Sequence, residues 1–126
     1  MAQQAAGEQT RPPKPQSREL VVFHAEICQA LADPTRIAIL YELADGPRNV
    51  SEIAAALGQP QPAVSRHLKT LRDRGMVKAE RSGGYVVYSL ADRRVVEALD
   101  LLRAVMARVL SDRRELVDEL SHLAAR

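Results

Sequence analysis

The sequence predicts a mostly α-helical fold with one small β-hairpin, and three patterns lead to this prediction. Apolar residues recur at helical spacing in several short segments, of which Gln61–Gly75 is the clearest. Residues 76–81 and 85–90 alternate as strands do, on either side of a glycine turn. Residues 92–124 carry apolar side chains in alternating steps of four and three, as a helix with a coiled-coil seam does. The expected parts are a disordered tail (1–17), a compact core (18–91) and a C-terminal helical dimerisation segment (92–126).

The composition is that of one small domain with tails. Of the 126 residues 46% are apolar, but only 3% are aromatic and none is Trp, so Ala, Leu and Val must form the core. Such a core favours helices and often gains support from a second subunit. A single Cys excludes an internal disulfide framework, and we see neither a signal peptide nor an apolar run of membrane length. We therefore expect a cytoplasmic protein with no membrane partner.

The net charge of +2 hides an uneven distribution along the chain. Residues 66–81 contain six Lys or Arg against two acidic residues, a balance of +4. Residues 21–65 contain two against five, a balance of −3, and residues 92–126 contain seven of each. The positive charge is therefore concentrated in residues 66–81, which begin within the helix predicted at Gln61–Gly75. A surface that neutralises nucleic-acid phosphates requires such a concentration.

Two helices are expected to follow the Gln- and Pro-rich tail, which has no periodicity. Residues 18–32 form the first, with an apolar stripe. Asp33 can cap the second helix and Pro34 suits its first position, so this helix should run from Pro34 to about Leu43. The stripe of the first helix consists of Leu20, Phe23, Ile27, Ala30 and Leu31, and the inward residues of the second are Ile37, Leu40 and Tyr41.

The next two helices are short and joined by a turn that contains glycine. Ser51 is expected to cap the first of them, Gly58 ends it, and Gln61 begins the second. This is the helix-turn-helix arrangement, in which the second helix enters a DNA groove. At about 100° per residue, Ile53, Ala54 and Leu57 face the core from the first helix, Val64, Leu68 and Leu71 do so from the second, and Pro62, Arg66, Lys69 and Asp73 point outward with Ser65 beside them.

A β-hairpin follows the charged helix and completes a winged helix-turn-helix. Ser82-Gly83-Gly84 forms its turn, and Tyr85 and Tyr88 are expected to pack within the second strand. A two-stranded hairpin is marginal in water, so this wing must pack on the helices. Its tip would bring Arg81 near a phosphate or the minor groove.

The C-terminal segment has two interpretations. Asp92 can cap one long helix whose seam is interrupted by Arg113, or the helix breaks near Ser111 and restarts with Asp112 and Glu115 as a capping box. Either way the seam is too long for this small core to cover, which predicts a homodimer with two recognition helices on a palindromic DNA site. The seam consists of Val95, Leu99, Leu102, Met106, Val109, Arg113, Leu116, Leu120 and Leu123.

Three motifs in order resemble those of the ArsR/SmtB-type winged-helix transcriptional repressors, over about residues 20–105. The resemblance implies a dimeric repressor that binds an imperfect inverted repeat and leaves the DNA when a ligand or a chemical change arrives. The motifs are Ala32-Asp33-Pro34-Thr35-Arg36-Ile37-Ala38-Ile39-Leu40, then Val50-Ser51-Glu52-Ile53-Ala54 with Gln61–Leu68, Leu71-Arg72 and Gly75-Met76-Val77, and finally Gly84-Tyr85-Val86-Val87-Tyr88-Ser89-Leu90.

The metal sites of that family do not carry over to this sequence. Where arsenite-sensing members have Cys-x-Cys, this chain has Asn49 and Ser51, which supply no thiolate. Where zinc-sensing members have Asp-x-His and a later His-x-x-Glu or His-x-x-His, this chain has Asp92-Arg93-Arg94 and then Val105 and Arg108. We therefore expect no metal at these positions and no cofactor.

His24 and Cys28 form a second, weaker candidate sensor site, because a spacing of four places them on one helix face. His122 would complete a site if the C-terminal helix met the first one. The alternative is that Cys28 is a small core residue and His24 a surface residue. The switch therefore stays open: a metal or a thiol-reactive agent at Cys28, an unidentified small molecule in the dimer cleft, or no ligand at all, with control by expression level.

The leading prediction is a sequence-specific DNA-binding repressor that acts as a homodimer on double-stranded operator DNA. Gln61 and Ser65 would approach base edges, and Arg66 a guanine or a phosphate. The alternatives are a repressor that responds to metal or thiol chemistry, and a winged helix that binds a protein. An enzyme is excluded, because we find no glycine-rich phosphate loop, nucleophile elbow or catalytic cluster. The predicted DNA-binding residues are Gln61, Pro62, Ser65, Arg66, His67, Lys69, Thr70, Arg72 and Arg81, of which Lys69 and Arg72 would bind phosphates, and His67 is either DNA-proximal or structural.

Overall fold

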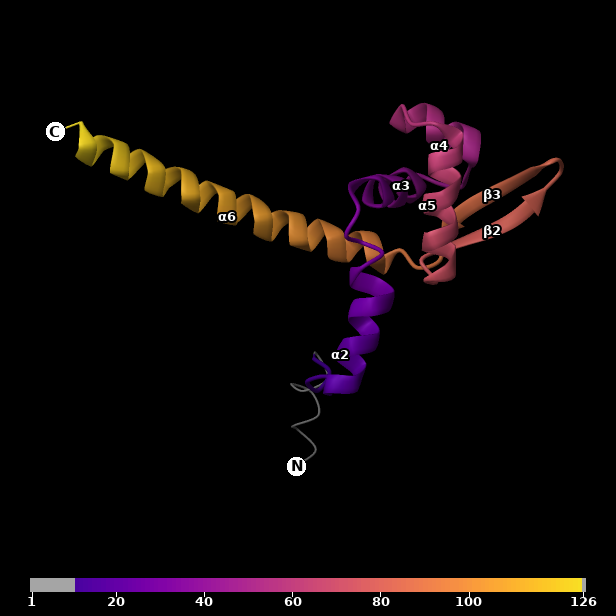
Figure 1. The fold of residues 1–126 in the computed structure, drawn as a ribbon, viewed down its shortest axis with the longest axis horizontal. Coiled ribbons are helices and arrows are strands. Elements are labelled where there is room, and N and C mark those ends of the chain that lie inside the picture. Colours follow the sequence, from indigo (N-terminus) through magenta and orange to yellow (C-terminus); the bar gives the residue numbers. More distant parts are fainter. Residues whose placement is uncertain (1–10, 126) are drawn as a thin grey trace.

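A computed structural model describes residues 11–125 of the chain. Figure 1 shows a body of short helices and a β-hairpin, from which one long helix projects. Residues 11–16 are exposed and precede the first helix; the rest of the predicted tail, 1–10, lies outside the described residues. The elements are α2 (Ser17–Phe23), η1 (His24–Cys28), α3 (Pro34–Ala44), β1 (Arg48–Asn49), α4 (Val50–Leu57), α5 (Gln61–Asp73), β2 (Val77–Ser82), β3 (Tyr85–Leu90) and α6 (Arg94–Ala124).

Helices α3, α4 and α5 enclose the core of the body. The predicted start of α3 is confirmed: Pro34 is its first residue, and Asp33 Oδ1 accepts the backbone N–H groups of Thr35 at 2.8 Å and Arg36 at 3.1 Å. The inward faces predicted for α4 and α5 are also confirmed, because their apolar residues join one cluster. The largest fully buried side chains are Ile39, Leu40, Ile53, Val64, Leu68 and Leu71.

The cap of α4 differs from the prediction. Asn49 is the N-cap, not Ser51: Asn49 Oδ1 accepts the Glu52 N–H at 2.9 Å, and Glu52 Oε1 accepts the Asn49 N–H at 2.9 Å. This reciprocal pair is a capping box. The chain is still extended at Asn49, which pairs with Val87 in the sheet, so the cap lies two residues before the predicted one and Ser51 lies in the first turn of the helix.

The predicted hairpin is present as β2 and β3, which pair antiparallel from Val77↔Leu90 to Ser82↔Tyr85. Its turn uses Gly83 at φ +62°, a conformation that glycine adopts without a steric cost. A third strand, β1, was not predicted; it lies on the other side of β3, so the strand order is β1-β3-β2. This short strand ties the start of α4 to the wing.

The first helix is less regular than the predicted helix 18–32. Segment α2 is α-helical, but η1 is a π-helical turn in which the Gln29 N–H donates to His24 O at 3.0 Å. The predicted apolar stripe is buried only at its end: Ala30 is 1% exposed, whereas Leu20 and Phe23 are 50% and 51% exposed. Much of this helix therefore presents apolar surface outward.

Helix α6 is continuous from Arg94 to Ala124, so of the two interpretations left open by the sequence the single long helix is confirmed, and the break near Ser111 is absent. The segment contains no Gly or Pro, and one continuous helix keeps backbone hydrogen bonds that a restart would sacrifice. At the start, Asp92 Oδ1 accepts the Arg94 N–H at 2.9 Å, in line with the expected cap, although the N-cap itself is Arg93. The Arg94 guanidinium also binds this carboxylate and lowers its pKa to about 2.

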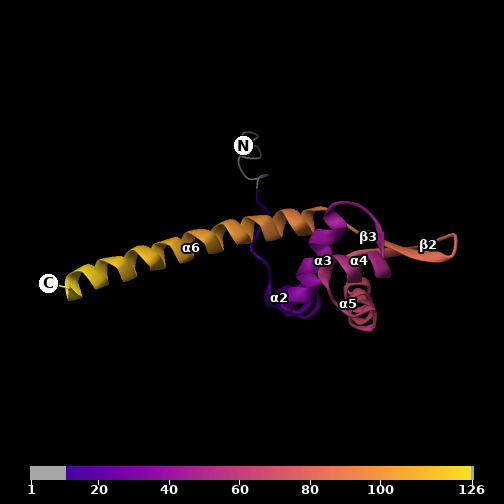
Figure 2. The ribbon, with the colours of Figure 1, turned by 90° about the horizontal axis from the view of Figure 1, so that it is seen from above.

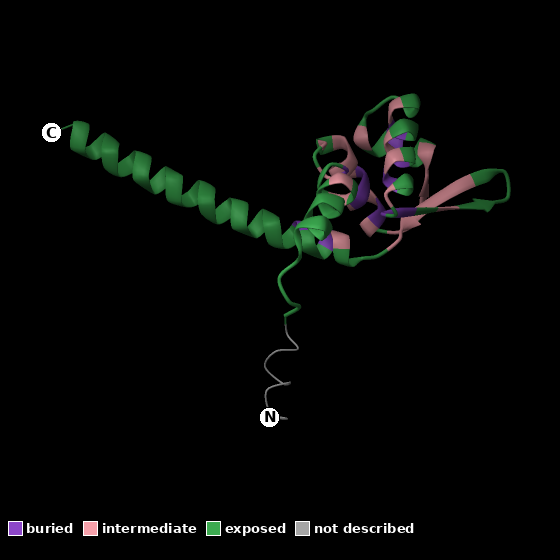
Figure 3. Ribbon diagram, turned by 60° about the horizontal axis from the view of Figure 1, so that its bottom comes forward, coloured by how far each residue is buried: buried purple, intermediate pink, exposed green. Residues whose placement is uncertain are grey.

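Only the first turns of α6 touch the body. Within the described part of α6, Val96 and Leu99 are buried, whereas every residue from 101 to 125 is exposed (Figure 3). The Tyr41 hydroxyl donates to Asp100 Oδ1 at 2.6 Å, and the Arg103 guanidinium lies 5.2 Å from the centre of the Tyr41 ring. These contacts hold the first turns of α6 on the body, and Figures 1 and 2 show that the rest of the helix projects away from it.

Among residues 11–125, no helix has both the length and the apolar character that a membrane span requires.

Candidate nucleic-acid interface

Helix α4 and the turn after it position α5. Gly58 ends α4 in the left-handed region at φ +63°, and the Gln59 N–H reaches back to Ala54 O at 3.1 Å. This pattern closes the last turn of a helix and reverses the chain within a few residues. The prediction that Gly58 ends this helix is confirmed, and α5 begins at Gln61 as expected.

Helix α5 has one face in the core and the opposite face in solvent. Val64, Leu68 and Leu71 are all 0% exposed, which anchors the helix on the body without using its outer side. The predicted contact residues divide into two groups. Gln61, Pro62, Ser65, Arg66, Lys69 and Arg72 are exposed, whereas His67 and Thr70 are half-buried.

The first turn of α5 has no side-chain cap among residues 11–125, and its N-cap is Pro60. Its second residue is a proline, which has no N–H, and the N–H groups of Ala63 and Val64 both donate to Pro60 O at 3.1 Å. This helix start therefore favours an anion mainly through the helix dipole. The Gln61 amide, predicted to approach base edges, donates to Ser51 Oγ at 3.0 Å and so links α5 to α4.

The cations of the outer face differ in their partners. Lys69 Nζ lies 2.9 Å from Asp73 Oδ2, and this hydrogen bond lowers the pKa of the Asp73 carboxyl. Both side chains are exposed, and a surface pair of this kind contributes little, so a phosphate can compete for Lys69. Arg66, Arg72 and Arg81 form no ion pair within residues 11–125. These three guanidinium groups are available to an external anion.

His67 faces α3 rather than solvent. Its Nε2 lies 3.9 Å from Asp33 Oδ1, and its Nδ1 lies 3.3 Å from Arg36 Nη1. The pKa of Asp33 is lowered, first by the hydrogen bond from the Arg36 backbone N–H and also by the charge of His67. Of the two roles considered for His67, DNA-proximal or structural, this geometry agrees with the structural role. Thr70 is likewise engaged, since its hydroxyl donates to Arg66 O at 3.3 Å.

One cation of the basic stretch, Arg74, points away from the outer face. Its Nη1 donates to Ala25 O at 2.8 Å and to Glu26 Oε2 at 3.0 Å, both in η1. The cations of residues 66–81 therefore do not all share one face, because Arg74 lies on the side of α5 that meets the first helix.

The wing carries exposed residues at its tip. Arg81 pairs with Val86 across the hairpin and its side chain is exposed. Tyr88 packs partly against the core, as predicted, but Tyr85 is 64% exposed and does not pack there. The difference arises because Tyr85 opposes Ser82 beside the turn, beyond the reach of the helices.

The candidate sensor residues His24 and Cys28 both lie in η1 and are exposed. The structure does not bring His122 to them: α6 carries it away from the body (Figures 1 and 2), and its Nδ1 lies 2.9 Å from Asp118 O. Within residues 11–125 no three His, Cys, Asp or Glu side chains group as metal ligands. The sensor assignment therefore stays a prediction that rests on two residues.

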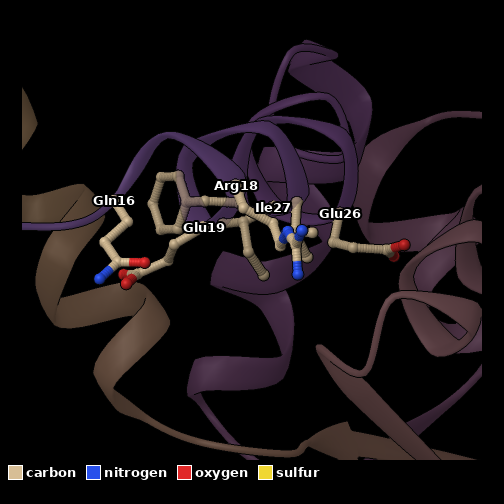
Figure 4. Close-up of a pocket in the computed structure, with 7 residues that line it drawn as sticks. Gln16, Arg18, Glu19, Glu26 and Ile27 are labelled. Carbon is tan, nitrogen blue, oxygen red and sulfur yellow. The ribbon is translucent and has the colours of Figure 1, made fainter.

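Two hollows flank the first helix. One, of about 600 Å³, lies along its outer side, where Figure 4 shows Gln16 and Glu19 directed away from Glu26. The other, of about 620 Å³, lies between η1, the end of α5 and the start of α6, and includes Cys28. Its wall consists mainly of the apolar residues Phe23, Ile27, Leu31, Met76, Val95, Ala98, Leu99 and Leu102, with Arg74, Asp92 and Arg94 also present.

Arg36 was not named as a site residue from the sequence, although it belongs to the Asp-Pro-Thr-Arg motif. It contributes three contacts: Nε donates to Ala30 O at 2.7 Å, Nη2 donates to Gln29 O at 3.0 Å, and Nη1 lies beside His67. The motif was the available signal, but only the fold shows that its arginine reaches both the first helix and α5.

Comparisons with known proteins agree with this geometry. The family profile described as "Bacterial regulatory protein, arsR family" matches residues 33–79. The HTH-type transcriptional repressor SmtB of Mycobacterium tuberculosis is 49% identical over 80 residues, which cover 64% of this chain and 59% of SmtB. The chain thus spans about three fifths of the length of that curated relative.

Two solved structures extend the match. The crystal structure of Rv0081 from Mycobacterium tuberculosis superposes with a TM-score of 0.68 at 40% identity and covers 75% of this chain and 95% of Rv0081. The solution structure of Mb0332 from Mycobacterium bovis has a TM-score of 0.65 at 31% identity and covers 77% of this chain and 90% of that one. It is described as a homodimeric winged helix-turn-helix DNA-binding domain of a possible ArsR-family transcriptional regulator. Fold, motifs and relatives agree: this chain has the winged helix-turn-helix fold and belongs to the ArsR family of bacterial regulatory proteins.

Proposed function

We propose that the protein is a homodimeric repressor that binds an inverted-repeat operator in double-stranded DNA. The observation that carries the proposal is the outer face of α5, where exposed cations stand on a helix whose other face is completely buried. Arg66 would read a guanine or bind a phosphate, Lys69 and Arg72 would bind phosphates, and Arg81 would make the wing contact. Operator DNA lies in the cytoplasm, so this role agrees with the location expected from the sequence.

The second copy is proposed to bind along α6. Its residues from 101 onward are exposed, yet they include many large apolar side chains in steps of four and three. A lone helix with such a face is marginal in water, whereas pairing of two copies buries both faces. The homodimeric state of the Mb0332 domain supports this arrangement. The exposed apolar residues are Leu101, Leu102, Val105, Met106, Val109, Leu110, Leu116, Val117, Leu120 and Leu123.

The DNA-binding proposal can be tested with duplexes that the wild-type protein selects from a random library. Arg66→Ala should weaken binding of the selected duplex by about 1–3 kcal/mol, the cost of losing a good guanine contact, while sedimentation still shows a dimer. Arg114→Ala is the matched control, because it removes the same charge from α6, away from α5. Equal affinity of wild type and Arg66→Ala would refute this role. If wild type selects no duplex and shows no salt-dependent binding, a protein-binding winged helix becomes the better assignment.

The proposed sensor can be tested on the same duplex. Wild type and Cys28→Ser are compared with zinc, copper, arsenite, peroxide and persulfide. Release of wild type alone by one of these agents supports a metal or thiol switch at Cys28. If none of them releases wild type, Cys28 is not the sensor for this chemistry.

A further inference from the structure

Arg74 connects the end of the recognition helix to the first helix. It is the C-cap residue of α5, and its Nη1 donates to Ala25 O at 2.8 Å and to Glu26 Oε2 at 3.0 Å. Its side chain is 34% exposed, so it lies against the body and not in open solvent. A cation with two acceptors inside its own chain is poorly placed to serve as a phosphate contact.

The π turn of η1 makes the backbone part of this contact available. In an α-helix the Gln29 N–H would donate to Ala25 O, but here it donates to His24 O at 3.0 Å. Ala25 O is thereby open to a donor from outside the helix, and Arg74 supplies one. The π turn and Arg74 therefore act together: the turn leaves Ala25 O free to accept a hydrogen bond, and Arg74 donates it.

Arg36 makes a second connection between the same two helices. It donates to Gln29 O and Ala30 O, in the turn that directly follows the first helix, and lies 3.3 Å from His67 on α5. His67 and Arg74 are seven residues apart, which is about two helical turns, so they lie on the same side of α5. The recognition helix is therefore held to the first helix at two points along its length.

This side of α5 also borders the surface where the second copy would bind. Arg74 lines the hollow of about 620 Å³ together with Phe23 of the first helix and Leu102 of α6. A second copy bound along α6 would therefore lie close to η1, which is bonded to the end of α5.

We infer that Arg74 is a positioning residue: its bonds to Ala25 and Glu26 set the placement of each recognition helix relative to the dimer, and hence the spacing between half-sites that the protein accepts. This inference rests on the proposed function as a dimer on an inverted repeat. It assigns the residue no contact with DNA.

The test uses the full chain and the duplex selected by wild type, together with a series in which the spacer between half-sites is lengthened or shortened by one or two base pairs. Arg74→Ala should remain folded and dimeric but bind the selected duplex roughly tenfold more weakly, the size expected for one charge-assisted hydrogen bond. Its preference among the spacers should flatten, because the recognition helices are no longer held at one separation. The slope of affinity against salt should stay that of wild type, since no phosphate contact is lost.

Glu26→Ala gives the sharper comparison. It removes a negative charge, so a general electrostatic effect, or an Arg74 freed to touch DNA, would strengthen binding. The inference predicts weaker binding, by about threefold, because Ala25 O still holds Arg74. Glu19→Ala is the matched control: Glu19 lies on the same helix, and Figure 4 shows it directed away from Glu26.

The outcomes separate the two proposals. If Arg74→Ala lowers the salt slope by about one and keeps the spacer preference, Arg74 touches phosphate and the inference is wrong. Tighter binding by Glu26→Ala overturns it as well. If wild type itself binds no duplex, the proposed function fails and not only the role of Arg74. Should Arg74→Ala unfold, Glu26→Ala and the spacer series still decide.

Discussion

Helices α5 and α6 both carry an apolar stripe, but they differ in how much of it the chain buries. Helix α5 buries its stripe completely, with Val64, Leu68 and Leu71 at 0% exposed. Helix α6 buries two residues near its start and leaves the rest of a 31-residue helix outside. The difference shows which apolar surface the chain covers by itself and which it leaves uncovered. The outer face of α5 is polar and free for a charged ligand, whereas the apolar face of α6 requires another protein surface.

The largest effect on stability should come from shortening one leucine of the apolar stripe to Ala, and we compare this change in α5 and in α6. Leu68→Ala opens a cavity in the core and should lower the free energy of unfolding by about 2–5 kcal/mol. Leu120→Ala should cost nothing in the isolated chain, because Leu120 is 55% exposed there, and should destabilise only the dimer. Urea unfolding over a range of protein concentrations checks this. Equal losses at low concentration would show that α6 packs on its own body.

A charge placed in the α6 seam should separate the two copies. Leu116→Glu would bury two unpaired carboxylates in each dimer, so we expect the dimer dissociation constant to rise by about a hundredfold. Ser111→Glu is the control, since it lies away from the seam on the same helix. Sedimentation equilibrium measures both. A dimer that tolerates Leu116→Glu as well as Ser111→Glu would place the interface elsewhere.

A smaller, pH-dependent effect should appear at the joint between α3 and α5. Hydrogen bonds hold the pKa of Asp33 below its ordinary 3.8, so its stabilising effect is complete above that pH and is lost as pH falls through the lowered pKa. Asp33→Ala should therefore cost about 1 kcal/mol at neutral pH, and this difference from wild type should shrink below about pH 4. Asp112→Ala on α6 is the control. A difference that grows on acidification would contradict the role of the carboxylate.

The sequence was sufficient for features that depend on local patterns. The stripe of α5, the cap at Asp33, the glycine at the end of α4 and the hairpin follow from helical spacing and turn chemistry, and each is present. The exposure of the cations on α5 could also be predicted, because a helix that buries Val64, Leu68 and Leu71 turns its opposite face to solvent. These features together support the family resemblance that the comparisons confirm.

The features that were missed depend on partners far away in the sequence. Asn49 and Ser51 are both good caps, and only the pairing of Asn49 with Val87 decides between them. The π turn could not be read from residues 24–28, since it is supported by an arginine 49 residues later. The direction of Arg74 was hidden for the same reason: a charge count along the chain does not tell which side of a helix meets another helix.

The small share of α6 that enters the core has a consequence for the order of folding and assembly. The core draws on Val96 and Leu99 from this helix, so closing the winged body does not need the exposed residues that follow. Folding of the body is then a reaction of one chain, which is independent of the seam residues from Leu102 onward. Association follows as a separate step whose rate depends on how many finished chains are present. A cell could therefore hold folded copies that have not yet paired, and under the proposed function their number would set the delay before repression begins.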